Sequence, residues 1–436
     1  MKQYDSYKES GVEWIGKVPT HWEIMPLKFT GTFGNGLTYS PKDVVDNGIL
    51  VLRSSNIQNS SLSFEDNVYV SNVSKVLLVQ KGDVIICSRN GSAALVGKSA
   101  FIDKEINATF GAFMMRYIPK INKKYGFYLF QTAIGRYKGY FATTTINQLT
   151  KSTIGEMKVP LANTEEQTAI VDFLDNKCSE IDKVISAQQK RIALLQELKQ
   201  SVITHAVTKG LNPNVEMKDS GVDWIDEIPA NWEVLPLKRV GTMNKGLTFT
   251  KADIVEKGNA AISYGQVHSK LNEGISLQDE LIRFVPNTFV SNAEKSIAYQ
   301  GDFIFADTSE DYEGCGNCVY NDTTRPIYGG YHTIVLQTKY SDAKFLAYLF
   351  KTDYWRYQIR SRVYGVKVFS ITQSILSLCS VILPPKEVQK DIVSFLDGKC
   401  KAINISIDNA LVQISLLQEY KQSLITEVVT GKRKVC

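Results

Sequence analysis

Residues Ser10–Lys28, SGVEWIGKVPTHWEIMPLK, return almost unchanged as residues Ser220–Lys238, SGVDWIDEIPANWEVLPLK. Trp22 corresponds to Trp232, so the offset is 232 − 22 = 210 residues. Such a period is far longer than the roughly 20–50 residues of a solenoid unit. The repeat therefore predicts a tandem duplication, in which each copy is a whole domain with an appendage.

A second repeated segment lies further along each copy. Residues 167–178, QTAIVDFLDNKC, return as 389–400, QKDIVSFLDGKC, and LLQELKQSVIT at 194–204 returns as LLQEYKQSLIT at 416–426. The segments between the repeated ends differ: CSRNG at 87–91 stands opposite ADTSE at 306–310. Because loops carry function on a rigid frame, a shared scaffold with unlike loops predicts two related but different binding tasks.

Bulk composition is that of an ordinary folded protein. The 436 residues carry a formal net charge of +5, which permits nucleic-acid binding without demonstrating it. No apolar run approaches the ~18–20 residues of a membrane span, and the N-terminus lacks a signal-peptide pattern. Seven dispersed cysteines favour reduced thiols. We expect a cytoplasmic protein without a membrane-embedded part.

The fold class predicted is α+β: two tandem mixed α/β domains joined by two long helices that form an antiparallel coiled coil with pseudo-two-fold character. Short β-branched runs such as Ile49–Ser54 and Lys81–Cys87 predict strands, while 125–132 and 343–350 predict helices. The expected division is 1–160 and 211–384 for the domains, with helical spacers at 161–210 and 385–436.

Both spacers show a heptad pattern from about Thr164 to Thr208 and from about Pro385 to Thr430. Lys199 and Lys421 interrupt the apolar seam at equivalent positions, which favours a register or orientation device. An amphipathic helix packed only on its own domain is the alternative to a coiled coil. The predicted seam consists of Ile181, Ile185, Ile192, Leu195, Val202, Ile403, Ile407, Ile414, Leu417 and Leu424.

Catalytic patterns are missing from the sequence. Residues 91–99, GSAALVGKS, have one residue too many for a phosphate-binding loop, and 212–214, NPN, lacks the rest of a base-methylation box. The Cys315–Cys318 pair is a single C-x-x-C without the four ligands of a structural zinc site. We therefore expect no catalytic residue, no metal and no enzymatic activity in this chain.

Recognition is the remaining function class. Loop and strand-end residues with Arg, Asn, Gln and hydroxyl side chains are the types that contact base edges and phosphates. Arg53 stands opposite Tyr264 and Arg89 opposite Thr308, so the two domains are expected to recognise different sequences. The candidate DNA-binding residues are Arg53, Asn56, Ser88, Arg89, Asn90, Thr144, Thr145, Asn147, Tyr264, Gln266, Asp307, Thr308, Arg360, Arg362 and Lys367.

Over essentially its whole length the chain resembles the specificity subunits of type I restriction–modification systems. The resemblance is carried by the duplicated G-V-[ED]-W-I-x-x-[IV]-P-x-x-W motif at 11–22 and 221–232 and by the run from Pro160 to Asp175. The L-L-Q-E-x-K-Q-S ending completes it in both copies. The second copy has Val388 where the motif has glutamate, which we expect to weaken one helix start.

The resemblance implies that each target recognition domain reads one half of a bipartite site in double-stranded DNA, with the helices setting the gap. It implies docking of two modification (methyltransferase) subunits, with S-adenosylmethionine and ATP held by partner subunits and no cofactor in this chain. Restriction/translocase subunits are expected to join that core. A coiled-coil scaffold that links protein partners without reading DNA is the alternative.

Overall fold

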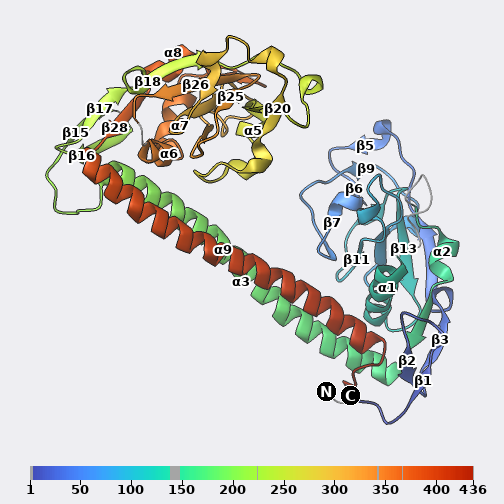
Figure 1. Cartoon of the computed structure of the whole chain (residues 1–436). Helices are drawn as coiled ribbons and strands as arrows, with labels where there is room; N and C mark the ends of the chain where they lie inside the picture. The colour runs from blue at the N-terminus through green and yellow to red at the C-terminus, as the bar shows by residue number, and fades with distance from the viewer. Residues whose placement is uncertain (1–2, 138–147, 223, 341–342, 366, 436) are drawn as a thin grey trace. The chain divides into compact units, whose positions relative to one another are not determined.

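A computed structural model describes residues 3–137, 148–222, 224–340, 343–365 and 367–435 (Figure 1). The chain divides into two compact units. Unit 1 contains residues 1–188 and 411–436, and unit 2 contains residues 189–410. Both chain ends therefore belong to unit 1.

Unit 1 is built on two four-stranded sheets in the orders β11-β10-β13-β4 and β12-β6-β9-β5. Strand β6 pairs in parallel with β12 and antiparallel with β9. The strands of these sheets are β4 (Gly31–Asn35), β5 (Val44–Val45), β6 (Ile49–Leu52), β9 (Tyr69–Val70), β10 (Val84–Cys87), β11 (Ser99–Phe101), β12 (Ala108–Phe110) and β13 (Met114–Pro119). Short two-stranded pairs surround them, formed by β1 (Tyr7–Glu9) with β2 (Lys17–Pro19), β3 (Glu23–Pro26) with β14 (Lys158–Leu161), and β7 (Ile57–Gln58) with β8 (Ser61–Leu62).

Unit 2 repeats the first sheet in the order β18-β26-β22-β24 and has a second sheet in the order β20-β19-β25-β21. Strand β19 again has one parallel partner, β25, and one antiparallel partner, β20. These strands are β18 (Gly241–Lys245), β19 (Asn259–Ile262), β20 (Arg283–Val285), β21 (Ile297–Ala298), β22 (Phe303–Ala306), β24 (Cys318–Tyr320), β25 (Ile327–Gly329) and β26 (Thr333–Thr338). The remaining pairs are β15 (Met217–Val222) with β16 (Ile225–Pro229), β17 (Glu233–Pro236) with β28 (Ser380–Leu383), and β23 (Thr308–Ser309) with β27 (Phe369–Ser370).

In each unit one helix lies where the apolar spacing predicts it, α1 (Lys123–Tyr137) in unit 1 and α6 (Lys344–Leu349) in unit 2. In unit 1, α1 places Tyr125 and Phe130 in the core, and α2 (Lys151–Gly155) follows it. In unit 2 the equivalent region is divided into two helices, because Thr352 leaves the helix and caps the second one. The helices of unit 2 are α4 (Leu237–Val240), α5 (Tyr264–Val267), α6 (Lys344–Leu349), α7 (Asp353–Arg360) and α8 (Gln373–Leu378).

The two spacers are single long helices, α3 (Thr164–Lys209) and α9 (Lys386–Val429). They run antiparallel. In unit 1 the Lys421 ammonium donates to both Asp182 carboxylate oxygens at 2.7 Å, and in unit 2 the Lys199 ammonium donates to the Asn404 side-chain oxygen Oδ1 at 2.9 Å. The ten predicted seam residues are all buried or half-buried. The predicted fold class, two tandem mixed domains with two long packed helices, is confirmed.

The repeated Trp motif explains how each unit closes on a spacer. In unit 1, Trp22 is fully buried and packs on Gly431, which follows the end of α9 with φ +72°. In unit 2, Trp232 packs on Gly210, which follows the end of α3 with φ +77°. A residue with a Cβ at either glycine is disfavoured by the positive φ and by the indole ring. Each domain therefore begins against the end of the helix from the other repeat.

The F-L-D part of the second repeated segment fixes the other end of each spacer. The Tyr128 hydroxyl donates to the Asp175 carboxylate at 2.6 Å, and the Tyr348 hydroxyl donates to Asp397 at 2.7 Å. Glu166 adds a contact that only unit 1 has, because its carboxylate accepts from the Trp22 indole at 3.0 Å and lies 3.0 Å from the His21 ring. Val388 replaces Glu166 in the second copy, where His21 corresponds to Asn231. The motif departure thus removes a tertiary contact.

Candidate nucleic-acid interface

In unit 1 three chain segments meet at the end of the central strand β10. The Ser88 amide donates to the Phe113 carbonyl at 2.9 Å, and the Leu149 amide donates to the Ser88 carbonyl at 2.7 Å. Arg89 and Gln148 form an antiparallel bridge. We call Ser88, Arg89, Phe113 and Gln148 the first loop cluster.

Unit 2 repeats this backbone arrangement at the end of β22. The Asp307 amide donates to the His332 carbonyl at 3.1 Å, the Ile371 amide donates to the Asp307 carbonyl at 2.7 Å, and Thr308 pairs with Ser370. We call Asp307, Thr308, His332 and Ser370 the second loop cluster. Because the hydrogen bonds correspond one to one, each residue of one cluster has an equivalent in the other.

The first loop cluster presents a cation over an aromatic ring. The Arg89 guanidinium carbon lies 5.3 Å from the centroid of the Phe113 ring, and Phe113 is 60% exposed. Ser88 is buried, and its hydroxyl donates to the Phe113 carbonyl at 2.9 Å, which fixes the turn under the ring. The surface that results offers guanidinium donors next to an apolar plate, the combination that contacts base edges and thymine methyl groups.

The second loop cluster presents a carboxylate and an imidazole instead. Asp307 Oδ1 accepts from the Thr308 hydroxyl at 2.8 Å and lies 2.9 Å from His332 Nδ1. His332 has a φ of +56°, an uncommon conformation for a residue with a side chain. The Tyr264 ring stands edge-on to His332 at a centroid distance of 5.7 Å. This part of unit 2 is rich in hydrogen-bond acceptors where unit 1 is rich in donors.

Arg53 and Asn56 are engaged within their own loop. Asn56 is fully buried and donates to the carbonyls of Ser63 and Asp66 at 3.1 and 3.0 Å. Arg53 Nη2 lies 2.7 Å from the Asp66 carboxylate. Hydrogen bonds from Ser55 and then from Arg53 lower the pKa of Asp66. These contacts support the loop shape, so we leave Arg53 and Asn56 out of the proposed interface.

The pairing of Arg53 with Tyr264 is wrong by one residue. The Arg53 amide donates to the Asn56 side chain at 3.0 Å, and the Ser263 amide donates to the Gln266 side chain at 3.1 Å. The same capping geometry makes Arg53 equivalent to Ser263 and Asn56 equivalent to Gln266. The error arose because the sequences of these two loops are too different to align residue by residue. Only the shared hydrogen bonds show which residues correspond.

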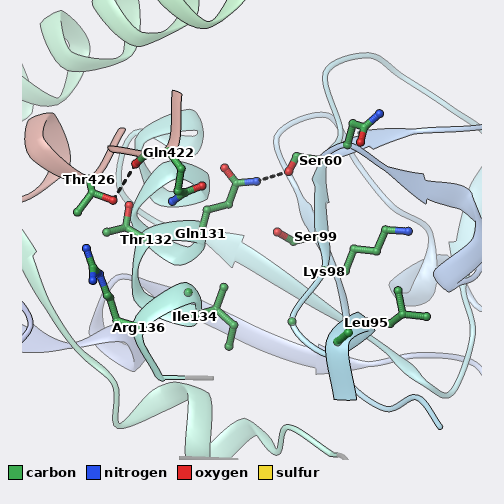
Figure 2. Close-up of a pocket in the computed structure, with 14 residues that line it drawn as sticks. Ser60, Leu95, Lys98, Ser99, Gln131, Thr132, Ile134, Arg136, Gln422 and Thr426 are labelled. Atoms are coloured by element: carbon green, nitrogen blue, oxygen red, sulfur yellow. Dashed lines mark hydrogen bonds between the residues drawn. The ribbon is translucent and has the colours of Figure 1, made fainter. Parts of the chain in front are cut away.

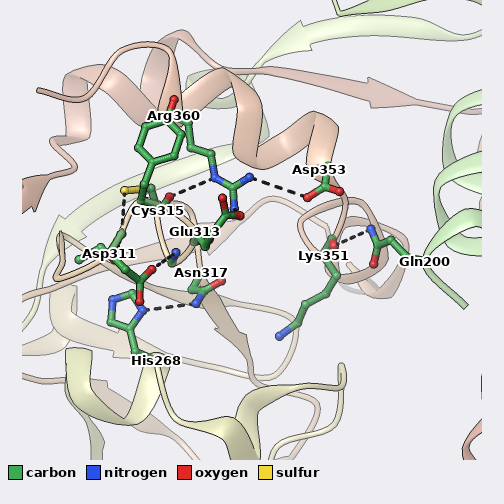
Figure 3. Close-up of polar contacts among 12 residues, drawn as sticks. Gln200, His268, Asp311, Glu313, Cys315, Asn317, Lys351, Asp353 and Arg360 are labelled. Atoms are coloured by element: carbon green, nitrogen blue, oxygen red, sulfur yellow. Dashed lines mark hydrogen bonds and ion pairs between the residues drawn. The ribbon is translucent and has the colours of Figure 1, made fainter. Parts of the chain in front are cut away.

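Two predicted arginines of unit 2 also serve the domain itself. Arg360 donates to the carbonyls of Tyr312 and Glu313 at 3.1 and 2.6 Å and pairs with the Glu313 carboxylate, so its side chain is only 12% exposed (Figure 3). Arg362 lies over the Trp224 ring at 5.4 Å and donates to the Gln358 carbonyl. These arginines brace the loop and the repeated Trp motif respectively.

The other candidates fall into three groups. Asn90 donates to the Ser54 hydroxyl at 3.3 Å, which connects the first loop cluster to the neighbouring loop. Lys367 is exposed. The remaining predictions, Thr144, Thr145 and Asn147, lie outside the described residues.

Sequence reasoning missed Phe113 and His332 as site residues. A usable signal existed, because each follows a glycine by two residues, Gly111 and Gly330, and stands directly before a strand, β13 or β26. An aromatic or imidazole ring at the tip of such a turn has no core to pack into. Its exposure, 60% for Phe113 and 40% for the His332 side chain, is therefore informative.

A second surface lies on the spacer helices. Leu194 and Leu198 of α3 are 64% and 50% exposed, and the equivalent Leu416 and Tyr420 of α9 are 58% and 52% exposed. Exposed apolar side chains one helical turn apart form a contiguous patch. We call these pairs the α3 patch, in unit 2, and the α9 patch, in unit 1.

A pocket of about 650 Å³ in unit 1 is lined by residues of α1, by residues of α9 and by the segments at 59–60 and 94–99 (Figure 2). Gln131, Arg136 and Gln422 line it, and Gln131 donates to the Ser60 hydroxyl at 2.7 Å. In unit 2 the residue equivalent to Gln422 is Gln200, which donates to the Lys351 carbonyl at 3.1 Å (Figure 3). Equivalent spacer residues, Gln422 and Gln200, thus face the domain in both units, so the pocket lies where a domain packs on a spacer helix.

Catalytic and metal chemistry find little support in the described part of the chain. Burial raises the pKa of the Cys315 and Cys318 thiols to about 11, which disfavours the reactive thiolate form. Among the described residues no group of three or more His, Cys, Asp or Glu side chains is arranged to hold a metal ion. No described helix is long and apolar enough to cross a membrane.

Comparisons with known proteins agree with this picture. The chain is 22% identical over 442 residues to the type I restriction enzyme StySPI specificity subunit of Salmonella potsdam, covering 96% of this chain and 90% of that protein. It is also 22% identical to the MjaVIII specificity subunit of Methanocaldococcus jannaschii, covering 84% and 83% of the two chains. The fold matches, at a TM-score of 0.67 and 15% identity, a chain from a solved structure on complex assembly and conformational transition of the type I R-M system, covering 94% of this chain and 98% of that one.

The family model for the type I restriction modification DNA specificity domain matches this chain twice, at residues 19–193 and 229–412. Each match includes one domain together with most of the spacer that follows it. The family resemblance drawn from the repeated motifs is therefore confirmed: the chain belongs to the type I restriction modification DNA specificity domain family.

Proposed function

We propose that this chain is the non-catalytic DNA-recognition subunit of a type I restriction–modification complex, with each unit reading one half of a bipartite site in double-stranded DNA. The observation that carries the proposal is the pair of loop clusters, which share their backbone hydrogen bonds but expose unlike side chains. A scaffold without DNA readout has no need for two such surfaces on a common frame.

The test is selection of bound duplexes from a random library by the full-length chain, alone and with its modification subunits. We expect two unlike half-sites separated by a constant gap. Binding should weaken by orders of magnitude between ~50 and ~200 mM salt, as it does for proteins that make six to ten phosphate contacts. Absence of any selected sequence contradicts the proposal and supports the scaffold alternative.

We further propose that the α3 and α9 patches each dock one copy of the same partner, the modification subunit. Two repeat-related patches, one in each unit, suit two identical partners, because equivalent surfaces bind equivalent surfaces. S-adenosylmethionine and ATP are then held by partner subunits, and restriction/translocase subunits join the resulting core. A few residues at the centre of a protein interface contribute most of its binding energy, so two exposed positions in each patch can decide whether a partner docks.

Charged substitutions in one patch should remove one partner copy. Leu194→Glu with Leu198→Glu is expected to leave one modification subunit per chain, and Leu416→Glu with Tyr420→Glu should remove the other. Native mass spectrometry measures the stoichiometry directly. Ile405→Glu is the matched control, because Ile405 is equally exposed at 50% but corresponds to Lys183 in the other copy. Two bound copies in both patch variants contradict this docking assignment.

A further inference from the structure

The second loop cluster fixes the hydrogen-bonding character of the His332 ring. An ionised carboxylate only accepts hydrogen bonds, so the 2.9 Å contact with Asp307 places the proton on Nδ1. When the ring is neutral, Nε2 therefore keeps an acceptor lone pair, and among the described residues Nε2 forms no hydrogen bond. The side chains of His332 and Asp307 are 40% and 31% exposed, so both acceptors reach the surface.

The equivalent place in unit 1 has the opposite character. The Arg89 guanidinium can only donate, and no hydrogen bond or ion pair within the described residues occupies it. Its contact with the Phe113 ring holds it in place without using its N–H groups. Arg89 corresponds to Thr308, and Phe113 corresponds to His332. Two units with the same backbone thus present a donor surface and an acceptor surface.

We infer that the two half-sites are read at these equivalent places with opposite base-edge chemistry. Arg89 takes the O6 and N7 acceptors of a guanine, while Asp307, supported by His332, accepts from an exocyclic base amine in the major groove. The inference rests on the proposed function and adds the chemistry of each contact. Guanidinium to guanine and carboxylate to an amine such as cytosine N4 are the pairings that base-edge geometry favours.

Base contact explains the second loop cluster better than phosphate contact. A carboxylate repels the phosphate backbone, so Asp307 at the exposed surface weakens any site that only tracks phosphates. The Thr308 hydroxyl and the His332 ring hold the carboxylate in one orientation, which a directional base contact requires. Tyr264 and Tyr331 stand around the His332 ring at centroid distances of 5.7 and 4.1 Å and keep it in place.

A double-mutant cycle between protein and DNA tests the inference. The duplex selected by the full-length chain is remade with one base amine removed at a time in the half-site of unit 2, using 2-pyrimidinone for cytosine or purine for adenine. At one position the loss of the amine should weaken binding of the unsubstituted protein about tenfold or more. The Asp307→Ala variant should start weaker by a similar factor and lose nothing further at that position.

Unit 1 supplies the reciprocal cycle. Replacement of one guanine by 7-deazaguanine should weaken binding of the unsubstituted chain but not that of Arg89→Ala, and neither change should affect the half-site of unit 2. Glu310→Ala is the matched control, since Glu310 is an exposed carboxylate three residues from Asp307. If Asp307→Ala fails to fold, Asp307→Leu keeps a branched side chain without a hydrogen-bond acceptor and serves in the same cycle.

The outcomes separate this inference from the proposed function. A chain that selects no sequence at all overturns both. If the chain selects a bipartite site, but Asp307→Ala is weakened by the same amine removals as the unsubstituted chain, only the base-edge assignment for unit 2 is overturned. Equal weakening of all DNA by Arg89→Ala shows a phosphate contact and overturns the assignment for unit 1.

Discussion

Replacing Trp22 by alanine is expected to lower the free energy of unfolding of unit 1 by about 3–5 kcal/mol, the usual cost of emptying a large aromatic site in a core. Trp22 is fully buried where the start of the domain, the start of α3 and the end of α9 meet. Its loss also removes the indole donor from the Glu166 carboxylate, which is itself buried. Both effects weaken the contact between the first domain, the start of α3 and the end of α9.

Amide hydrogen exchange measures this result, because it resolves the two units separately. Protection should fall in the α3 residues 164–188 and the α9 residues 411–429, while the sheets of unit 2 keep theirs. Phe29→Ala is the control, since Phe29 is 64% exposed and its truncation should cost less than about 0.5 kcal/mol. Unchanged protection in Trp22→Ala is incompatible with a structural role for the repeated Trp motif.

The architecture could be predicted because it depends on periodic and repeated signals. The heptad pattern placed helices at 164–208 and 385–430, and the structure has them at Thr164–Lys209 and Lys386–Val429. The repeat identified Trp22 and Trp232 as equivalent, and both pack on a glycine that follows a spacer helix. Duplication of a whole domain preserves such contacts, so the same pair of packing residues can be found at equivalent positions in both repeats.

The loop residues could not be predicted to the same extent, because residue type does not reveal what a side chain already binds. Asn56 and Arg360 have the side chains of base readers, yet their polar groups are used inside the domain. Phe113 and His332 have no such signature, and their position at a turn tip becomes visible only when the backbone hydrogen bonds of the units are compared. Exposure and free hydrogen-bonding capacity are three-dimensional properties.

Val388 shows how a departure from a motif can be interpreted once contacts are known. The sequence predicts a weaker helix start at Val388, yet α9 begins at Lys386, two residues before it. What unit 2 lacks is the carboxylate that joins Trp22 and His21 to α3 in unit 1. The paired change of His21 to Asn231 and Glu166 to Val388 therefore concerns one tertiary contact and not helix formation.

Lengthening both spacers by one heptad should shift the preferred gap between the half-sites by about three base pairs. Seven residues extend a helix by about 10.5 Å, at 1.5 Å per residue, and DNA rises about 3.4 Å per base pair along one strand. We propose that the helices set the gap, as the family resemblance implies, and this expectation follows from that proposal. Selection from a library with random gap lengths is the measurement.

The insertion points follow from the antiparallel pairing. Asp182 pairs with Lys421, and Lys199 pairs with Asn404. The two contacts are separated by 17 residues on α3 and by 17 residues in the opposite direction on α9. The same pairing places Leu195 opposite Asp408, so insertions after Leu195 and after Ile407 lie opposite one another. Seven residues at each point keep the apolar seam continuous and leave both cross-helix lysine contacts in place.

A four-residue insertion at the same two points is the matched control. It breaks the heptad phase, so apolar seam residues turn toward water and assembly should be impaired. The seven-residue variant should remain folded, retain both half-site sequences and change only the gap, because the loop clusters lie outside the spacers. A folded heptad variant that still prefers the original gap shows that something other than α3 and α9 sets the spacing.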